Sequence, residues 1–342
     1  MSAEALLWAC VVASLGPGCS VKKADRGPTP SAPDPVAGRP VAVPTASAAS
    51  ADGAPFAGAQ RPREIVSRSE LELSGIAWAP TLGKYLVVSD DVVMPGADKH
   101  PPWIFALSPS GELDPSPIVI EGVPDLNDAE SICAGPDGTF FLTTSHSRNL
   151  KGHLPPGRRR LLQIALAGKN SRVVGQVDLT EVRGTDGGLL DGPLDLEAIT
   201  WRADGLYLGF KAPLVDGRAT ILRVADPAAQ LAAGKIKPET VSLWARPRLC
   251  LESREGHPCQ GVADMTFLPD GALLIVANAP KGMPKDGGGA LWKLPGPDKS
   301  PAFLQWFEGY KPEGIALSPD RTAAVIVFDR DRKQPEWLRW PL

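Results

Sequence analysis

A short pattern that recurs five times constrains the fold of this 342-residue chain more than any other feature. Its clearest copy, Gly192–Lys211, contains a pair of carboxylates, an apolar run, an Asp-Gly turn and then alternating apolar residues. Two short antiparallel strands joined by a hairpin account for such a copy. The turn positions are 50 to 67 residues apart and are occupied by Thr81, Asp137, Asp204, Asp270 and Asp320.

Strand pairs repeated at this period predict an all-β fold, a single β-propeller in which each copy forms the inner half of a four-stranded blade. We predict five blades, with six as the alternative because the long spacers can hide another. The last blade lacks one strand, which Glu64–Arg68 can supply by pairing with Trp337–Trp340. This pairing would close the ring and remove an exposed sheet edge. The innermost strands are expected to start at Gly75, Ser131, Ala198, Met265 and Gly314.

Composition supports one propeller domain over residues 63–342. Hydrophobic residues make up 43% and charged residues 22%, and 35 Gly with 36 Pro suit many short strands joined by turns. A net charge of -3 gives no indication of nucleic-acid binding. We expect a monomer.

The N-terminal residues read as a targeting segment and a tether. Leu6–Leu15 is apolar but too short to span a bilayer, and Cys19 follows small residues as in the lipobox of bacterial lipoproteins. Residues 1–19 are therefore expected to be a signal peptide, with Cys19 lipidated as the only membrane contact. Residues 20–62 are rich in Pro, Ala and Ser, which predicts a disordered linker. An outer-membrane lipoprotein is expected, and a periplasmic or secreted protein is the alternative.

Cys250 and Cys259 flank a polar loop, and we predict a disulfide between them. Zinc binding by this pair with His257 is the alternative, although a fourth ligand is missing nearby. Cys133 falls in a predicted strand and is expected only to pack.

Propeller geometry places the start of each innermost strand beside the loop between the second and third strands, around the channel mouth. One repeat position there is Glu130, Glu197 and Glu313 in three of the copies, and Asp195 lies close by in sequence. Gathered carboxylates repel one another unless they bind a cation such as Ca²⁺ or Mg²⁺ or pair with Lys and Arg. We predict these four residues as metal ligands. The alternative is that each glutamate braces its own hairpin.

The loop Ser145–Arg160, SHSRNLKGHLPPGRRR, is the most basic stretch of the chain and is expected at the same mouth. Its guanidinium groups match phosphate or carboxylate oxygens, and its His146 is a candidate general acid or base. The predicted ligand-binding residues are Arg148, Arg158, Arg160 and Lys211. The alternative is a solvated loop that braces the blade by pairing its arginines with Asp186, Asp191 and Asp195.

The same loop carries a resemblance to a known family. SHSRN, the run RRRLL from Arg158, LDLEAI from Leu194 and GFKAPLVDGRA from Gly209 resemble a bacterial β-propeller family filed as a domain of unknown function, which is similar to the extracytoplasmic esterase-like phytase domain. The resemblance covers roughly residues 70 to 342. It implies a propeller in an extracytoplasmic setting and supplies no catalytic residue. Lys211 stands where the family usually has Arg, which weakens bidentate anion binding there.

Two classes of function follow. The first is an envelope-tethered propeller that binds an anionic small molecule or a surface polymer at the channel mouth. The second is a metal-assisted phosphoesterase, in which a bound cation polarises a phosphate oxygen and activates water. A sugar-lactonase-like enzyme is a weaker third option, because such enzymes place a carboxylate in the first blade where Ser74 stands. The sequence contains no GxSxG, P-loop, HExxH or dinucleotide-binding motif.

Overall fold

The computed structural model describes residues 61–67, 70–93, 101–149, 151–179, 194–251, 259–280, 287–330 and 334–342. All of them belong to one compact unit, Ala51–Leu342. The predicted signal peptide, the lipidated Cys19 and nearly all of the predicted linker lie outside the described residues. Within the described part, no helix is long and apolar enough to cross a membrane.

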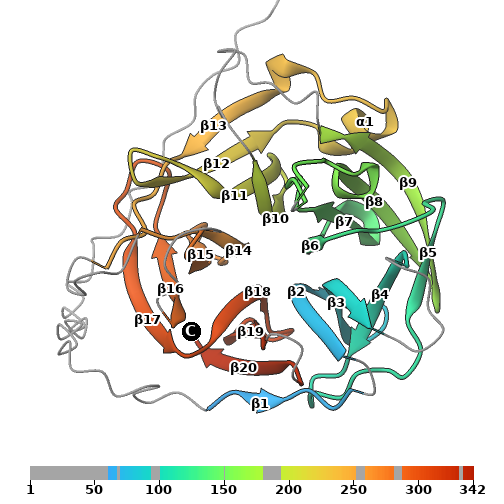
Figure 1. Cartoon of the computed structure of the whole chain (residues 1–342), viewed down its shortest axis with the longest axis horizontal. Coiled ribbons are helices and arrows are strands. Elements are labelled where there is room, and N and C mark those ends of the chain that lie inside the picture. The colour runs from blue at the N-terminus through green and yellow to red at the C-terminus, as the bar shows by residue number, and fades with distance from the viewer. Residues whose placement is uncertain are drawn as a thin grey trace, which may run out of the picture. The chain divides into compact units, whose positions relative to one another are not determined.

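The described residues form an all-β, propeller-like arrangement of mostly antiparallel sheets (Figure 1). Two sheets contain four consecutive strands each: β10 (Asp195–Arg202), β11 (Gly205–Val215), β12 (Arg218–Val224) and β13 (Val241–Ala245); then β14 (Gly261–Phe267), β15 (Leu273–Asn278), β16 (Gly288–Leu294) and β17 (Ala302–Glu308). A third has the order β1 (Arg63–Glu64), β20 (Glu336–Pro341), β19 (Ala323–Asp329) and β18 (Lys311–Leu317).

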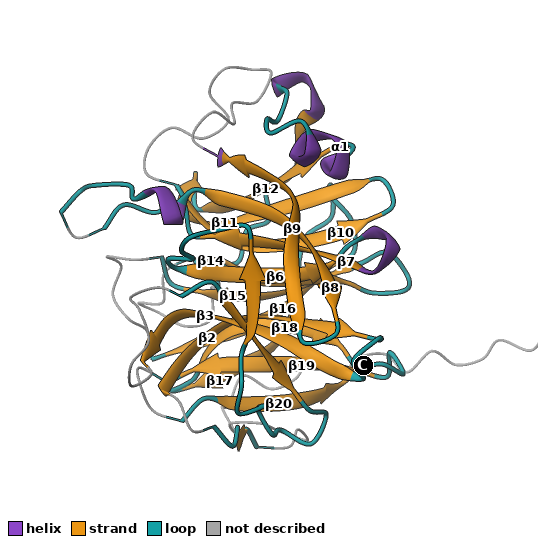
Figure 2. Ribbon diagram, turned by 90° about the vertical axis from the view of Figure 1, so that its right-hand side faces the viewer, coloured by secondary structure: helices purple, strands orange, loops and turns teal. Residues whose placement is uncertain are grey.

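The remaining sheet has eight strands, because two four-stranded halves join through their outer strands. The halves are β2 (Glu70–Ala79), β3 (Lys84–Val93), β4 (Trp103–Leu107) and β5 (Ile118–Glu121), and β6 (Ala129–Ala134), β7 (Thr139–Thr144), β8 (Arg160–Ala167) and β9 (Asn170–Asp178). Strand β5 pairs with β9 in parallel, which the sequence did not predict. A helix, α1 (Pro227–Ala232), packs on β8 and β9 (Figure 2).

The innermost strands β2, β6, β10, β14 and β18 surround the centre, each contacts the next, and β18 contacts β2 (Figure 1). Their close approach requires small residues. A side chain on Gly75 of β2 would lie 2.6 Å from Cα of Ser131 on β6. All five strands begin earlier than predicted, so the glutamates of the repeat position lie inside strands and not in loops that enter them.

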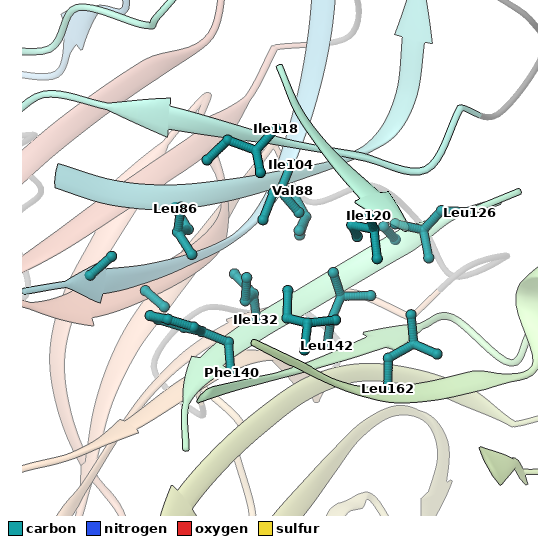
Figure 3. Packing of buried hydrophobic residues seen from close by; sticks show 14 of the residues in the cluster. Leu86, Val88, Ile104, Ile118, Ile120, Leu126, Ile132, Phe140, Leu142 and Leu162 are labelled. Atoms are coloured by element: carbon teal, nitrogen blue, oxygen red, sulfur yellow. The ribbon is translucent and has the colours of Figure 1, made fainter. Parts of the chain in front are cut away.

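The hydrophobic core lies between neighbouring sheets. Figure 3 shows one cluster, in which Leu86 and Val88 of β3 lie opposite Phe140 and Leu142 of β7. Because each sheet is covered on both faces, strands in the middle of a sheet are buried along their whole length. Strands β15 and β19 show this, with every residue buried.

The N-terminal strand pairs with the last strand, as predicted, but over other residues. Arg63 pairs with Trp337 and Glu64 with Glu336, so β1 is shorter than the predicted Glu64–Arg68. The Ile65 N–H continues this contact just before β20 by donating to Pro335 O at 2.7 Å, and the Val66 N–H then donates to Gly111 O, between β4 and β5, at 3.1 Å. Ile65 is fully buried in the core. The segment therefore connects the last sheet to the first.

Candidate functional site

A β-bulge interrupts every innermost strand at the repeat position. In β6, Ala129 pairs with Thr144 and Ser131 with Thr143, which leaves Glu130 as the extra residue. The corresponding extra residues of β2, β10, β14 and β18 are Ser74, Glu197, Ala263 and Glu313. A bulge breaks the alternation of a strand and redirects the side chain of the extra residue. The bulge therefore gives the repeat position an equivalent place in every innermost strand.

The three glutamates of this position are buried and close enough to influence one another. They are 7%, 8% and 4% exposed, for Glu130, Glu197 and Glu313 respectively. Burial and the charge of Glu197 raise the pKa of Glu130. Burial also raises the pKa of Glu197, against the charge of Lys211. Glu130 and Glu197 thus lie close together, and Glu197 and Glu313 share Lys211 as a partner.

Two lysines neutralise Glu197 and Glu313. Lys211 on β11 places Nζ 3.0 Å from Oε2 of Glu197 and 3.3 Å from Oε1 of Glu313. Lys311 on β18 places Nζ 2.6 Å from the same oxygen of Glu313 and 2.9 Å from Oδ2 of Asp329. Burial disfavours both ammonium groups, yet the neighbouring carboxylates outweigh it and raise the pKa of each lysine above its ordinary value.

Glu130 belongs to a different group, an acidic cluster of Asp90, Asp128 and Glu130. Each residue offers a carboxylate oxygen, and the three oxygens lie within 4.8 Å of one another, so the cluster can hold a metal ion. Burial, with the charges of Glu72 and Asp128, raises the pKa of Asp90. The Oδ1 atom of Asp90 is buried without a hydrogen-bond partner.

The predicted set of metal ligands is therefore divided. Glu130 shares a cluster with Asp90 and Asp128, which were not among the predicted ligands. Glu197 and Glu313 instead have ammonium groups as partners. Asp195 is 8% exposed, and its charge acts on Glu197 and Lys211. The sequence could not divide the set, because Lys211, which pairs with both Glu197 and Glu313, comes from a different strand than either glutamate.

The basic loop is largely occupied in ion pairs. Arg158 lies 2.9 Å from Asp128, which also accepts hydrogen bonds from the hydroxyls of Ser145 and Ser147. Arg160 lies 2.8 Å from Asp125. These ion pairs brace the loop, but their partners differ from the predicted Asp186, Asp191 and Asp195. Asp186 and Asp191 lie outside the described residues.

Two further loop residues, Arg148 and His146, were predicted to bind the ligand and to act as general acid or base. Among the described residues, neither forms a contact with the three glutamates. Arg148 is exposed and donates to Gly152 O at 2.9 Å. His146 is buried, its φ of 56° is in the left-handed region, and neither ring nitrogen has a hydrogen-bond partner. Burial lowers the pKa of His146. Its role as general acid or base stays a prediction.

Lys311, the partner of Glu313 and Asp329, was missed by sequence reasoning, although the repeat held a signal for it. Lys311 stands two positions before the bulged Glu313. The equivalent positions before Ser74, Glu130 and Glu197 are all acidic: Glu72, Asp128 and Asp195. This second repeat position carries a charge in four of the five copies and would have identified Lys311 and Asp128 together.

No protein-family model matches the sequence, and the comparison with curated proteins gave no match. Solved structures with a similar arrangement include a putative gluconolactonase (13% identity, TM-score 0.40, covering 83% of this chain and 93% of that one). A GH43 β-1,3-galactosidase with galactodeoxynojirimycin has 11% identity and a TM-score of 0.48, covering 79% and 90%. A glucose dehydrogenase has 12% identity and a TM-score of 0.45, covering 83% and 100%. Similarity this distant indicates nothing about the chemistry of this chain.

Proposed function

We propose that this protein is an envelope-tethered β-propeller that binds an anionic ligand at its channel mouth through a divalent cation. The cation would be held by Asp90, Asp128 and Glu130. The observation that carries the proposal is the convergence of three carboxylate oxygens within 4.8 Å of one another. Ionised carboxylates this close repel one another, and a cation between them relieves the repulsion.

The donor set fits a hard cation. Ca²⁺ and Mg²⁺ prefer carboxylate oxygens, and the buried Oδ1 of Asp90 needs a partner that no described residue provides. Three carboxylates also leave coordination positions of either ion for water or for an oxygen of the ligand. When bound, the ion would supply positive charge that attracts and orients a phosphate or carboxylate group.

The charge of the mouth explains why an anion would need the cation. Carboxylates outnumber the basic groups that pair with them among these described residues: Glu72, Asp90, Asp128, Glu130, Asp195, Glu197, Glu313 and Asp329 against Lys211, Lys311 and Arg158. An anion approaching alone would be repelled. The predicted ligand contacts Arg148, Arg158, Arg160 and Lys211 would then act beside the ion and not in its place.

Isothermal titration of the purified protein with CaCl₂ or MgCl₂ tests the proposal. Wild type should bind one of the two ions, while Asp90→Asn and Glu130→Gln should lose most of the affinity. Asp270→Asn is the matched control, because Asp270 is an exposed aspartate paired with Lys293 far from the cluster in sequence. Inorganic phosphate should then bind only in the presence of the ion. A wild-type protein that takes up neither ion would refute the proposal.

The phosphoesterase alternative is decided in the same preparation. Hydrolysis of p-nitrophenyl phosphate that needs the ion and disappears in His146→Ala would make the protein an enzyme. Binding of phosphate without turnover would leave it a binding protein for an anionic small molecule or a surface polymer.

Two further proposals concern the number of blades and the attachment to the membrane. The ring of innermost strands and the β1–β20 pairing support five blades closed by the N-terminal strand. The lipobox-like sequence supports lipidation of Cys19 and attachment to the outer membrane. Unchanged detergent partitioning after Cys19→Ala would contradict the anchor.

A further inference from the structure

The mouth contains two groups of carboxylates that are neutralised differently. We infer that it takes up one exchangeable cation, and that the ammonium of Lys211 permanently occupies a second cation position between Glu197 and Glu313. The inference rests on the proposed function, because it assumes that the acidic cluster binds the exchangeable ion.

The first argument is the position of the ammonium group. Lys211 Nζ lies 3.0 Å from a carboxylate oxygen on β10 and 3.3 Å from one on β18, two strands that β14 separates in the ring. The side chains of Lys211, Glu197 and Glu313 are 7%, 10% and 4% exposed. A buried charge that neutralises carboxylates from two different strands does what a bound metal ion would do.

The second argument is the unused coordination capacity of Glu313. Its Oε1 receives both Lys211 and Lys311, while its Oε2 is buried without a hydrogen-bond partner. A buried carboxylate oxygen without a partner is costly, and a metal ion could use both oxygens where an ammonium group uses one. The position thus has the oxygens of a cation site and is already filled by the chain.

The third argument is the contrast with the acidic cluster. Among the described residues, no lysine or arginine forms an ion pair with Asp90 or Glu130, and only Asp128 has one, with Arg158. Asp90 and Glu130 therefore have no ion-pair partner in the described part of the chain, and a bound cation could neutralise them. Glu197 and Glu313, by contrast, are already neutralised by lysines.

The inference limits which ligands and which reaction mechanisms the mouth could support. Two-metal phosphoesterases hold their substrate between two exchangeable ions about 3.5–4 Å apart. A mouth with one exchangeable ion and one tethered ammonium group cannot work in that way. Its ligand would be an anion that coordinates a single metal ion and lies beside an ammonium group fixed in the protein.

Metal content per chain tests the inference, measured by native mass spectrometry and by titration with CaCl₂ or MgCl₂. Wild type should bind one ion. Glu130→Gln should bind none, whereas Glu197→Gln should still bind one, with affinity lowered by no more than about tenfold because Lys211 already neutralises Glu197. Lys211→Met should bind two ions, and added Ca²⁺ should raise its melting temperature more than that of wild type.

The outcomes separate the inference from the proposed function. If wild type binds no ion, the proposed function fails. If wild type binds two ions, or Glu197→Gln loses its ion, the proposed function stands and the inference is overturned. Should Lys211→Met not fold, the comparison of Glu197→Gln with Glu130→Gln decides the question alone.

Discussion

The hydroxyl of Ser131 on β6 donates a 2.8 Å hydrogen bond to Oδ1 of Asp264 on β14, between residues 133 positions apart in the sequence. The other oxygen of Asp264 accepts the N–H of Ile315 on β18 at 2.8 Å, and Ser131 accepts the N–H of Ile199 on β10 at 3.1 Å. Both side chains are buried. Two side chains thus connect four of the innermost strands directly next to the bulged residues.

We predict that Asp264→Leu lowers the free energy of unfolding by about 2–5 kcal/mol, because it leaves a buried N–H and a buried hydroxyl without their acceptor. Asp264→Asn keeps an acceptor and should cost less. Urea denaturation at pH 7 measures both. Equal losses for the two variants would show that the hydrogen bonds contribute little.

Asp264→Asn also tests how the stability of the folded protein depends on pH. Burial raises the pKa of Asp264, against its hydrogen bonds from Ile315 and Ser131, so the folded protein holds this proton more tightly than the unfolded chain does. The stabilising contribution is complete below the unfolded-state pKa of about 3.9 and is lost as the pH rises through the folded-state pKa. The stability of wild type relative to Asp264→Asn should therefore fall as the pH rises from about 4. Parallel stability curves would contradict this.

Removing Lys211 should be costly when no metal ion is present. Lys211→Met leaves Glu197 and Glu313 buried without their shared ammonium group, and we expect a loss of about 3–5 kcal/mol in EDTA. Lys293→Met is the matched control, because the Lys293–Asp270 pair lies at the surface and should contribute less than about 1 kcal/mol. Similar losses for both lysines in urea denaturation would refute the buried network.

Closure by the N-terminal segment can be tested with two adjacent residues. Ile65 is fully buried, whereas Val66 is 69% exposed. Ile65→Ala should lower the free energy of unfolding by about 2–5 kcal/mol, and Val66→Ala should change it by less than about 0.5 kcal/mol. Thermal unfolding monitored by circular dichroism would compare them. If Ile65→Ala left the stability unchanged, the segment would not hold the last sheet to the first.

The predicted disulfide between Cys250 and Cys259 is present, with Cα atoms 4.2 Å apart. It closes a loop with a sequence separation of 9, so its removal should cost about 2–3 kcal/mol by the chain-entropy estimate. Cys250→Ser with Cys259→Ser should unfold at lower urea concentration than wild type. Adding a reductant should bring wild type to the same midpoint and leave the variant unchanged.

The sequence predicted the strands well, because Asp-Gly turns and alternating apolar residues are local signals. The predicted starts of the innermost strands were too late, because a bulge adds a residue and breaks the alternation of apolar residues at Glu130, Glu197 and Glu313. The β5–β9 pairing was missed because parallel pairing between outer strands leaves no local pattern. Spacing grouped Glu130, Glu197 and Glu313, but it could not assign partners such as Lys211 and Glu313, which are 102 residues apart.

The repeated bulge gives the chain a set of interchangeable positions. Ser74 and Ala263 occupy the two that carry no carboxylate, and neither side chain pairs across its hairpin register. Exchanging a side chain at a bulge leaves the ladder on either side intact, so the charge of the mouth can be altered one sheet at a time. A protein engineer could use Ser74→Glu to change what the mouth attracts while retaining the same scaffold, whereas Ala263 packs in a hydrophobic cluster that would not accept a carboxylate.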